Sequence, residues 1–357
     1  MRIRVEYARD LDVAQWETRH AAGEVPDYWP YGLNRLGGHG HTLSAAVSFS
    51  GRRTTRVAGI TSSRLGGIEW MDSMHRGIGA EDAELVLCQD ERSGLPALLR
   101  ERLRRRGRSV VTGSVWLSSG DGVTSIQRRL AQGVLPSAAA IWTYSHAEVD
   151  ALCATYGVPS NRVHPVDFGI DAEFFGPGGH GARRGVPLVV SAGNDRHRDF
   201  DTLAAALRSL RAAGVELEAR VATTRWSAPH ADRGWLQAGG TGARGIRSLY
   251  GEAAVVVVST HPNLHVSGLT VTLEAMCSGV PVVVSATPGF AHYVDHGRTG
   301  LLVPPGDGPA LAAAVRDVLA NPVAAVRMGQ AAREAVLLRF TTGHLAAQLD
   351  DIARNLG

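Results

Sequence analysis

The sequence predicts an α/β fold of two domains, each built around a buried parallel sheet. The chain has 357 residues, enough for two domains of ordinary size with separate cores. The run from Ala253 to Val258 is continuously apolar and rich in β-branched residues, as is typical of a strand buried on both faces. Residues 176–185 are dense in Gly and Pro and indicate a linker. Predicted helices alternate with such strands, which favours parallel sheets.

The first domain is expected to open on a strand and to alternate from there. Strands are predicted over residues 2–8, 42–49, 83–89, 109–115 and 138–144. Helices are predicted over residues 10–20, 95–106, 126–135 and 145–156. Ser145 is the expected N-cap of the last of these helices, with Glu148 at the capping-box position. The segment 51–79 shows little periodicity and is interpreted as loop with one helix.

The second domain repeats this alternation after the linker. Strands are predicted over residues 188–192, 216–223 and 253–258 and from residue 282 onward. Helices are predicted over residues 200–213, 270–278, 309–320, 323–340 and 342–355. Gly279 is expected to end the helix that starts at Thr270, because left-handed φ costs least at Gly, and Pro281 follows soon after.

Composition excludes several classes of protein. All 37 basic side chains are Arg, so chemistry that needs a Lys, such as a Schiff base or a P-loop, is excluded. The net charge is only +3 and the Arg residues are mixed with acids, which disfavours a nucleic-acid partner. The one dense basic run, 100–108, is interpreted as the exposed end of a helix.

The three cysteines and the hydropathy pattern indicate a compartment. Cys88, Cys153 and Cys277 are far apart and fit reduced thiols better than disulfides. The chain shows neither a signal region at its start nor a run of about 18 apolar residues. We therefore expect a cytoplasmic protein without an integral membrane segment, and the sequence leaves its oligomeric state open.

The stretch from Ser259 to Asp307 carries the strongest functional signal. The loop 261–268 follows a buried strand and precedes a helix, whose unpaired N–H groups and dipole attract an anion. Gly268 lets a ligand approach the backbone closely. Glu274 lies one turn into an otherwise apolar helix and is suited to accept hydrogen bonds from a vicinal diol. The alternative is a solvated Glu274 on an amphipathic helix.

Several motifs of this stretch carry a family resemblance. SGLTVTLEAMCSGVPVVV, TPGFAHYV, GRTGLLV and PPGD occur in this order and spacing. They resemble the donor-binding half of retaining GT-B glycosyltransferases of the family 4 type, the glycosyl transferases group 1. The resemblance implies two Rossmann-like domains that face each other across a cleft. It implies an acceptor-binding domain over residues 1–170, a donor-binding domain over 171–340, and a terminal helix, 341–357, that returns to the first domain.

The resemblance also assigns roles to residues. Arg196 and Arg198 stand where the family carries an Arg and a Lys against the diphosphate of a nucleotide sugar, and Arg can hold two phosphate oxygens at once. The family's nucleobase borders the backbone just before the helix that contains Arg247. The expected donor-binding residues are Ser267, Gly268, Leu269, Thr270, Glu274 and Thr223.

Two departures from the family pattern concern catalysis. The family has a second Glu eight residues before Glu274 that touches the sugar; this chain has Val266 there or, with an insertion shift, His265. His265 is therefore grouped with Arg196 and Arg198 as an expected catalytic residue. The family commonly places a His after the fourth strand, where this chain has residues 114–116, Ser-Val-Trp. We expect neither a bound metal nor a cofactor, because the arginines and the helix dipole would stabilise the leaving diphosphate without a metal.

The sequence thus predicts sugar transfer from a nucleoside diphosphate sugar to an acceptor, favouring a small molecule of specialised metabolism. Alternatives are a sugar-nucleotide epimerase or hydrolase on the same fold, and a catalytically silent nucleotide-sugar-binding protein. The residues 90–94, Asp-Glu-Arg-Ser-Gly, are expected to face the cleft. The aromatic residues Tyr28, Trp29 and Tyr31 either form an acceptor-stacking surface or pack under their loop.

Overall fold

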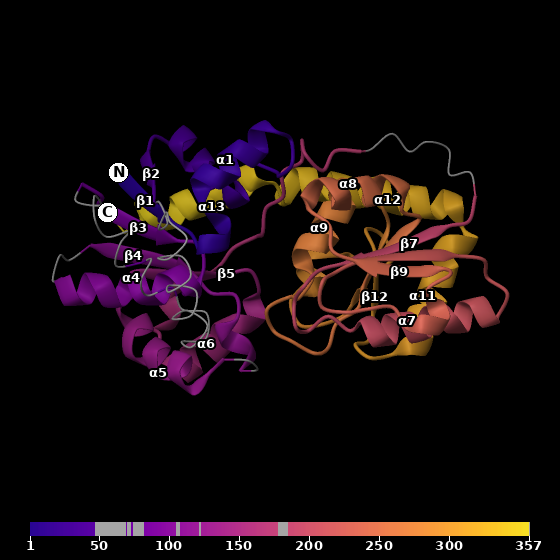
Figure 1. Cartoon of the computed structure of the whole chain (residues 1–357). Helices are drawn as coiled ribbons and strands as arrows, with labels where there is room; N and C mark the ends of the chain where they lie inside the picture. The colour runs from indigo at the N-terminus through magenta and orange to yellow at the C-terminus, as the bar shows by residue number, and fades with distance from the viewer. Residues whose placement is uncertain are drawn as a thin grey trace. The chain divides into compact units, whose positions relative to one another are not determined.

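The computed structural model describes residues 1–46, 69, 73, 82–104, 108–120, 123–177 and 185–356. The chain forms two compact units (Figure 1). Unit 1 comprises Met1–Ala22, Asp27–Asp167 and Gly343–Gly357, and unit 2 comprises Gly23–Pro26 and Phe168–Thr342. The end of the second predicted strand, the segment 51–79 apart from Glu69 and Ser73, and most of the linker lie outside the described residues.

Unit 1 is built on a parallel sheet of six strands in the order β2-β1-β3-β4-β5-β6. The strands are β1 (Arg2–Glu6), β2 (Thr42–Ala45), β3 (Leu85–Cys88), β4 (Ser109–Gly113), β5 (Ala140–Thr143) and β6 (Val163–Pro165). Strand β6 was not among the predicted strands, because three residues ending in Pro carry no readable alternation.

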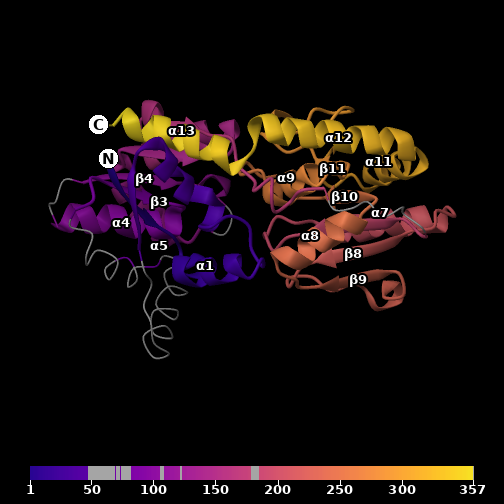
Figure 2. The ribbon, with the colours of Figure 1, turned by 90° about the horizontal axis from the view of Figure 1, so that it is seen from above.

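Apolar side chains cover both faces of this sheet. The helices of unit 1 are α1 (Val13–Ala21), α4 (Glu91–Arg104), α5 (Ser125–Val134), α6 (Val149–Tyr156) and α13 (Thr342–Arg354). Leu345 and Leu349 of α13 pack with Ile3 and Val5 of β1, whereas α4, α5 and α6 pack on the other face around Val86. Figure 2 shows α13, the last helix of the chain, lying against the strands of unit 1.

Three expectations for unit 1 were wrong in detail. Helix α4 begins at Glu91, so the acidic residues after β3 are buried at its start, and Asp90 and Glu91 are 2% and 3% exposed. Glu148 forms no capping box, because its carboxyl group accepts from the hydroxyls of Ser118 and Thr143. Arg100, at the start of the dense basic run, is fully buried.

The aromatic residues of the first loop divide between the two interpretations. Trp29 and Tyr31 pack against the apolar core of unit 1, and Trp29 Nε1 donates to Glu17 Oε1 at 2.8 Å. Tyr28 is half exposed. Packing under the loop therefore describes Trp29 and Tyr31, which are partly buried, and Tyr28 is the most exposed of the three.

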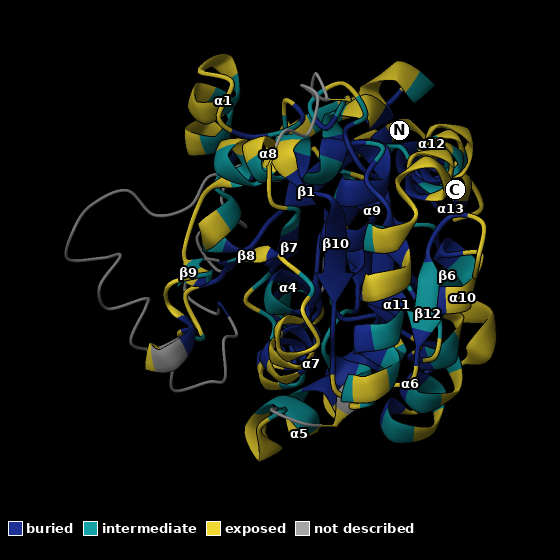
Figure 3. Ribbon diagram, turned by 90° about the vertical axis from the view of Figure 1, so that its right-hand side faces the viewer, coloured by how far each residue is buried: buried dark blue, intermediate teal, exposed yellow. Residues whose placement is uncertain are grey.

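Unit 2 has its own parallel sheet of six strands in the order β12-β11-β10-β7-β8-β9. The strands are β7 (Leu188–Ala192), β8 (Glu218–Ala222), β9 (Leu236–Gly239), β10 (Val255–Val258), β11 (Val282–Ser285) and β12 (Leu301–Val303). Strand β10 is buried along its whole length (Figure 3), as its continuous apolar run predicts. Strands β9 and β12 lie at the two edges and were not predicted.

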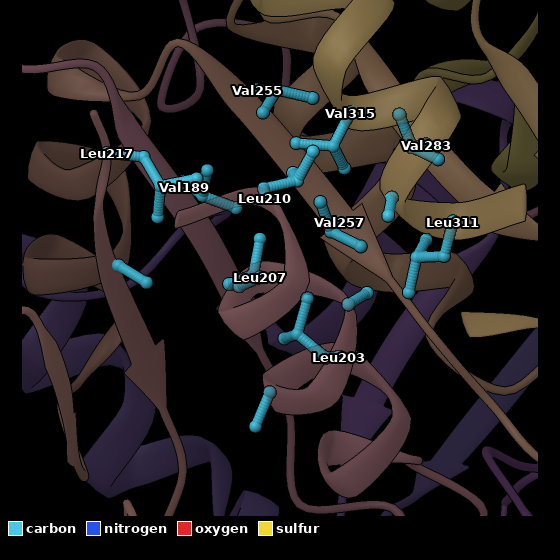
Figure 4. Packing of buried hydrophobic residues seen from close by; sticks show 14 of the residues in the cluster. Val189, Leu203, Leu207, Leu210, Leu217, Val255, Val257, Val283, Leu311 and Val315 are labelled. Atoms are coloured by element: carbon cyan, nitrogen blue, oxygen red, sulfur yellow. The ribbon is translucent and has the colours of Figure 1, made fainter. Parts of the chain in front are cut away.

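Helices cover this sheet on both faces. They are α7 (Phe200–Ala212), α8 (Ala243–Glu252), α9 (Leu269–Cys277), α10 (Phe290–Tyr293), α11 (Gly308–Ala320) and α12 (Pro322–Arg339). Alternate strand residues such as Val189 and Val257 pack against Leu207 of α7 and Val315 of α11 (Figure 4). Among the described helices none is by itself long and apolar enough to cross a membrane, and only α11 with α12, bent by 102°, passes that test as a pair.

Candidate functional site

The candidate site lies in unit 2, where the loops after β7, β8 and β10 meet at the carboxyl ends of their strands. Backbone hydrogen bonds join the loop after β7 to the loop after β10: Asp199 N–H donates to Ser259 O at 3.0 Å and His261 N–H donates to His197 O at 2.8 Å. Arg198 and Thr260 form an antiparallel bridge between them. These contacts fix the backbone of Arg198.

The guanidinium of Arg198 is buried and only partly satisfied. Arg198 is 6% exposed, and its Nη2 donates to Ser191 Oγ at 3.0 Å. Its Nε and Nη1 are buried and have no hydrogen-bond partner among the described residues. Burial lowers the pKa of Arg198 to about 10, so the group still carries its charge at neutral pH. A buried cation with two unused nitrogen donors is typical of a site that receives an anion.

The start of α9 lies beside this guanidinium. Gly268 is the N-cap residue with φ +86°, and no side chain caps the helix. A Cβ atom at this position would overlap with Nη1 of Arg198. The close approach brings two positive features together, a guanidinium and the amino end of a helix dipole.

The other predicted residues at the start of α9 differ in whether their backbone N–H groups are available to an anion. Ser267 N–H donates to Asn263 Oδ1 and Leu269 N–H donates to Val266 O, so these two amides already have acceptors. Thr270 is exposed. The backbone around Gly268 and Thr270 is therefore the part of the predicted set that is best placed for an incoming anion.

Glu274 lies one turn further along α9 and has a specific partner. The hydroxyl of Tyr250, on α8, donates to Glu274 Oε2 at 2.9 Å. Burial raises the pKa of Glu274 to about 8, and the bond from Tyr250 only partly offsets this. Glu274 is only partly exposed and its carboxyl group accepts from Tyr250, so the reading of Glu274 as a freely solvated residue does not hold.

The loop after β8 is held by Asn194. Its Oδ1 accepts from Thr223 Oγ1 at 2.9 Å and from Thr224 N–H at 2.8 Å. The hydroxyl of Thr223 is therefore used inside the protein, and Arg225 Nη1 donates to Asn194 O. Sequence reasoning did not single out Asn194, because its role depends on a contact 29 residues away.

Arg196 is exposed and contributes to a pocket of about 240 Å³ at this edge. Arg198 lines the same pocket, so the two predicted arginines come together there. The lining residues are Asp195, Arg196, Arg198, Asp199, Phe200, Asp201, Arg225, Trp226 and His261. A second pocket, of about 410 Å³, lies between β8, β9 and the start of α8 and includes Gly240, Thr241 and Gly245.

His265 is held by Asp195 from the loop after β7. Its Nε2 lies 2.9 Å from Asp195 Oδ2, and its ring meets that of His197 edge-on at 4.8 Å between centroids. Burial acts to raise the pKa of Asp195, but the hydrogen bond and charge of His265 outweigh it and hold that pKa well below its usual range. The spacing of Asp195, His197 and His265 along the sequence did not predict that they would come together.

The structure also shows the two places where the sequence departs from the family pattern, Val266 and residues 114–116. Val266 is 2% exposed and has φ 47°, an unusual conformation for a β-branched residue, so its side chain does not replace a polar contact. Ser114 is buried, and the N–H groups of Val115 and Trp116 donate to the carboxyl group of Glu91. That segment therefore caps a carboxylate of unit 1.

Comparison with known proteins agrees with the fold. Residues 186–321 match the family model described as glycosyl transferases group 1. They contain both Arg198 and Glu274, so the predicted resemblance to the glycosyl transferases group 1 is confirmed for this segment of the chain.

Individual relatives support the same assignment. A segment of 70 residues is 44% identical to glycogen synthase of Mycobacterium tuberculosis, covering 20% of this chain and 17% of that protein's length. The structure of sucrose-phosphate synthase from Thermosynechococcus elongatus matches with TM-score 0.72 and 19% identity over 100% of this chain and 99% of the other. HepE of Anabaena, in complex with UDP-glucose, matches with TM-score 0.68 and 14% identity over 100% and 99%. The fold is therefore GT-B, as predicted.

Proposed function

We propose that the chain is a glycosyltransferase that takes its sugar from a nucleoside diphosphate sugar. The observation that carries the proposal is the buried guanidinium of Arg198 against Gly268, with two nitrogen donors unused. Leaving a buried cation unpaired costs free energy, and a diphosphate would satisfy it. The matched family segment and the UDP-glucose bound by HepE support this choice of anion.

The same groups would act in the reaction. As the glycosidic bond breaks, negative charge accumulates on the leaving diphosphate, so fixed positive groups stabilise the transition state more than the ground state. Arg198 and the start of α9 supply such groups, and Arg196 lies at the mouth of the same pocket. We propose that Glu274, which contacts Tyr250, accepts from the ribose diol, and that His265, which contacts Asp195, touches the sugar.

The pocket at the start of α8 is where we place the nucleobase, beside the backbone of Gly240 and Thr241. We propose retention of anomeric configuration and a small-molecule acceptor, as the family resemblance and the sequence favour. Cys88, Cys153 and Cys277 form no disulfide with one another, which fits a reducing compartment, and we propose that the protein acts in the cytoplasm.

A catalytically silent nucleotide-sugar-binding protein is the second candidate. It is favoured by one observation: Val266 is apolar and buried where the family has a sugar-contacting Glu. This candidate shares the diphosphate site and differs only in turnover.

The test is calorimetry with UDP, GDP and dTDP, followed by a product assay with the matching sugar nucleotide. Arg198→Met should weaken binding of the preferred diphosphate by about 10- to 100-fold, because it removes hydrogen bonds to a charged group. Arg298→Met, which removes an exposed arginine paired with Asp295, is the matched control and should bind normally. Equal affinity of wild type and Arg198→Met would refute the site. Tight binding without a glycosylated product would favour the silent protein, and free sugar would favour a hydrolase.

A further inference from the structure

Three side chains beside Arg198 form a compact cluster of metal-ligating groups. Asp195, His197 and His265 each offer one ligand atom, and these atoms all lie within 4.8 Å of one another. His197 and His265 are both 6% exposed. The backbone pairing between the loop after β7 and the loop after β10 brings them together, so the cluster is built into unit 2.

Hydrogen bonding alone does not account for this arrangement. His265 Nε2 lies 2.9 Å from Asp195 Oδ2 and is satisfied by it. His197 Nδ1 lies 3.4 Å from Asp195 Oδ1, and it is buried without a hydrogen-bond partner among the described residues. A buried, unsatisfied imidazole nitrogen beside a carboxylate, with the ring of His265 at 4.8 Å from that of His197, is what a metal site would contain.

We propose that Asp195, His197 and His265 bind a divalent transition metal ion, with Zn²⁺ as the best fit. Two imidazole nitrogens and one carboxylate oxygen are a donor set that zinc takes, with a fourth position left open. Ligands about 2.0–2.1 Å from a tetrahedral ion lie about 3.3 Å from one another. His265 Nε2 lies 2.9 Å from Asp195 Oδ2 and His197 Nδ1 lies 3.4 Å from Asp195 Oδ1, and one ligand atom from each of the three residues lies within 4.8 Å of the others, so small side-chain shifts would bring them to that spacing.

The fourth coordination position of the ion, which no protein ligand fills, would serve the proposed reaction. Asp195 also lines the pocket that contains Arg196 and Arg198, so a water or phosphate oxygen on the ion would be next to both arginines. This consequence rests on the proposed function, whereas the metal site does not. The sequence predicted no metal ion, and spacing along the chain does not reveal that Asp195 and His265, which are 70 residues apart, come together.

The experiment uses the full chain without a polyhistidine tag, stripped of metal with a chelator, and no nucleotide. Zn²⁺ alone is titrated in competition with a chromophoric chelator, and Co²⁺ is added separately to record its visible absorption. The variants are His197→Gln, His197→Cys, Asp195→Asn and, as matched control, His261→Gln. His261 lies in the loop after β10, is exposed, and also neighbours an aspartate, Asp199, at 3.7 Å.

We expect one equivalent of Zn²⁺ and a tetrahedral Co²⁺ spectrum in the wild type. His197→Gln and Asp195→Asn should weaken zinc binding by at least about 100-fold, while His197→Cys, which restores a zinc ligand, should keep it. His261→Gln should bind as the wild type does. Absence of binding below about 1 mM Zn²⁺, or equal loss in His261→Gln and His197→Gln, would overturn the proposal. Because no nucleotide is present, that failure is separate from a failure of the diphosphate site.

Discussion

Gly268 leaves the space that the guanidinium of Arg198 occupies. A Cβ atom on residue 268 would overlap with Arg198 Nη1 and with Cγ1 of Val258. The backbone of Gly268 also has φ +86°, which L-residues rarely adopt. The contact between a helix start and a cation thus depends on a residue that has no side chain.

Gly268→Ala should therefore damage both stability and binding. Left-handed strain costs about 1–3 kcal/mol, and the clash adds displacement of Arg198. We expect nucleoside diphosphate affinity to fall at least about tenfold, measured by calorimetry beside thermal unfolding.

Gly297→Ala provides the control for backbone strain. Gly297 has φ +82° but has nothing within 4 Å of the added Cβ. It should lose a similar part of the stability while keeping its nucleotide affinity. If both variants lose affinity equally, the effect comes from strain and not from Arg198.

Arg198→Met should separate stability from ligand binding. The guanidinium of Arg198 is buried with two unused nitrogens, so an apolar side chain of similar length removes a desolvation cost. We expect denaturant unfolding without ligand to show unchanged or higher stability, by up to about 1–3 kcal/mol. Saturating nucleotide should stabilise the wild type and not the variant. A loss of more than about 1 kcal/mol without ligand would show that Arg198 supports the fold itself.

Glu274 should make the stability of unit 2 depend on pH. Its pKa is about 8 in the folded protein and near 4.5 in the unfolded chain, so between these values the folded state binds more protons. The free energy of unfolding should therefore fall as pH rises from about 5 to 8, by at most about 1.4 kcal/mol per pH unit. Glu274→Gln cannot ionise and should lose this dependence.

Calorimetric unfolding of the two proteins at several pH values tests this, with the difference between them as the readout. Subtracting the variant removes the contributions of other groups, such as Glu148, whose pKa burial raises to about 8. A difference that stays constant across this range would mean that Glu274 ionises in the folded state much as in water.

The features that the sequence predicted correctly are those that short local patterns determine. Apolar runs gave the central strands β7 and β10, and the Gly and Pro signals after Cys277 gave the end of α9. The apolar neighbours of Glu274 also indicated that it needs a partner. They could not identify Tyr250, which lies 24 residues away on another helix.

Short edge strands and long-range polar contacts could not be predicted from the sequence. Strand β12 has three residues, too few to show a period. The cluster of Asp195 with His265 joins residues 70 apart, and only the pairing of two loops brings them together. Arg100 shows the same limit, because a basic run in the sequence gives no sign of which member is buried.

Arg100 provides the last prediction, as a buried counterpart of Arg198 whose charge is paired with two carboxylates, Glu6 and Glu101. Its Nη2 lies 2.9 Å from Glu6 Oε1, its Nε donates to Glu101 Oε1, and its Nη1 donates to Ser73 O at 2.8 Å. Removing one member of a buried pair leaves the other charge uncompensated, which costs about 3–5 kcal/mol. Arg100→Met should therefore destabilise unit 1 by about that amount, in contrast to Arg198→Met.

The double variant Glu6→Leu with Arg100→Met decides whether the lost pair causes this effect. Both charges are then absent, so most of the stability should return, measured by denaturant unfolding in a double-mutant cycle. Nucleotide affinity should be unchanged in Arg100→Met wherever unit 1 remains folded, because the diphosphate groups contact unit 2 in our proposal. If the double variant is as unstable as Arg100→Met, packing around the Arg100 side chain, and not its charge, holds unit 1 together.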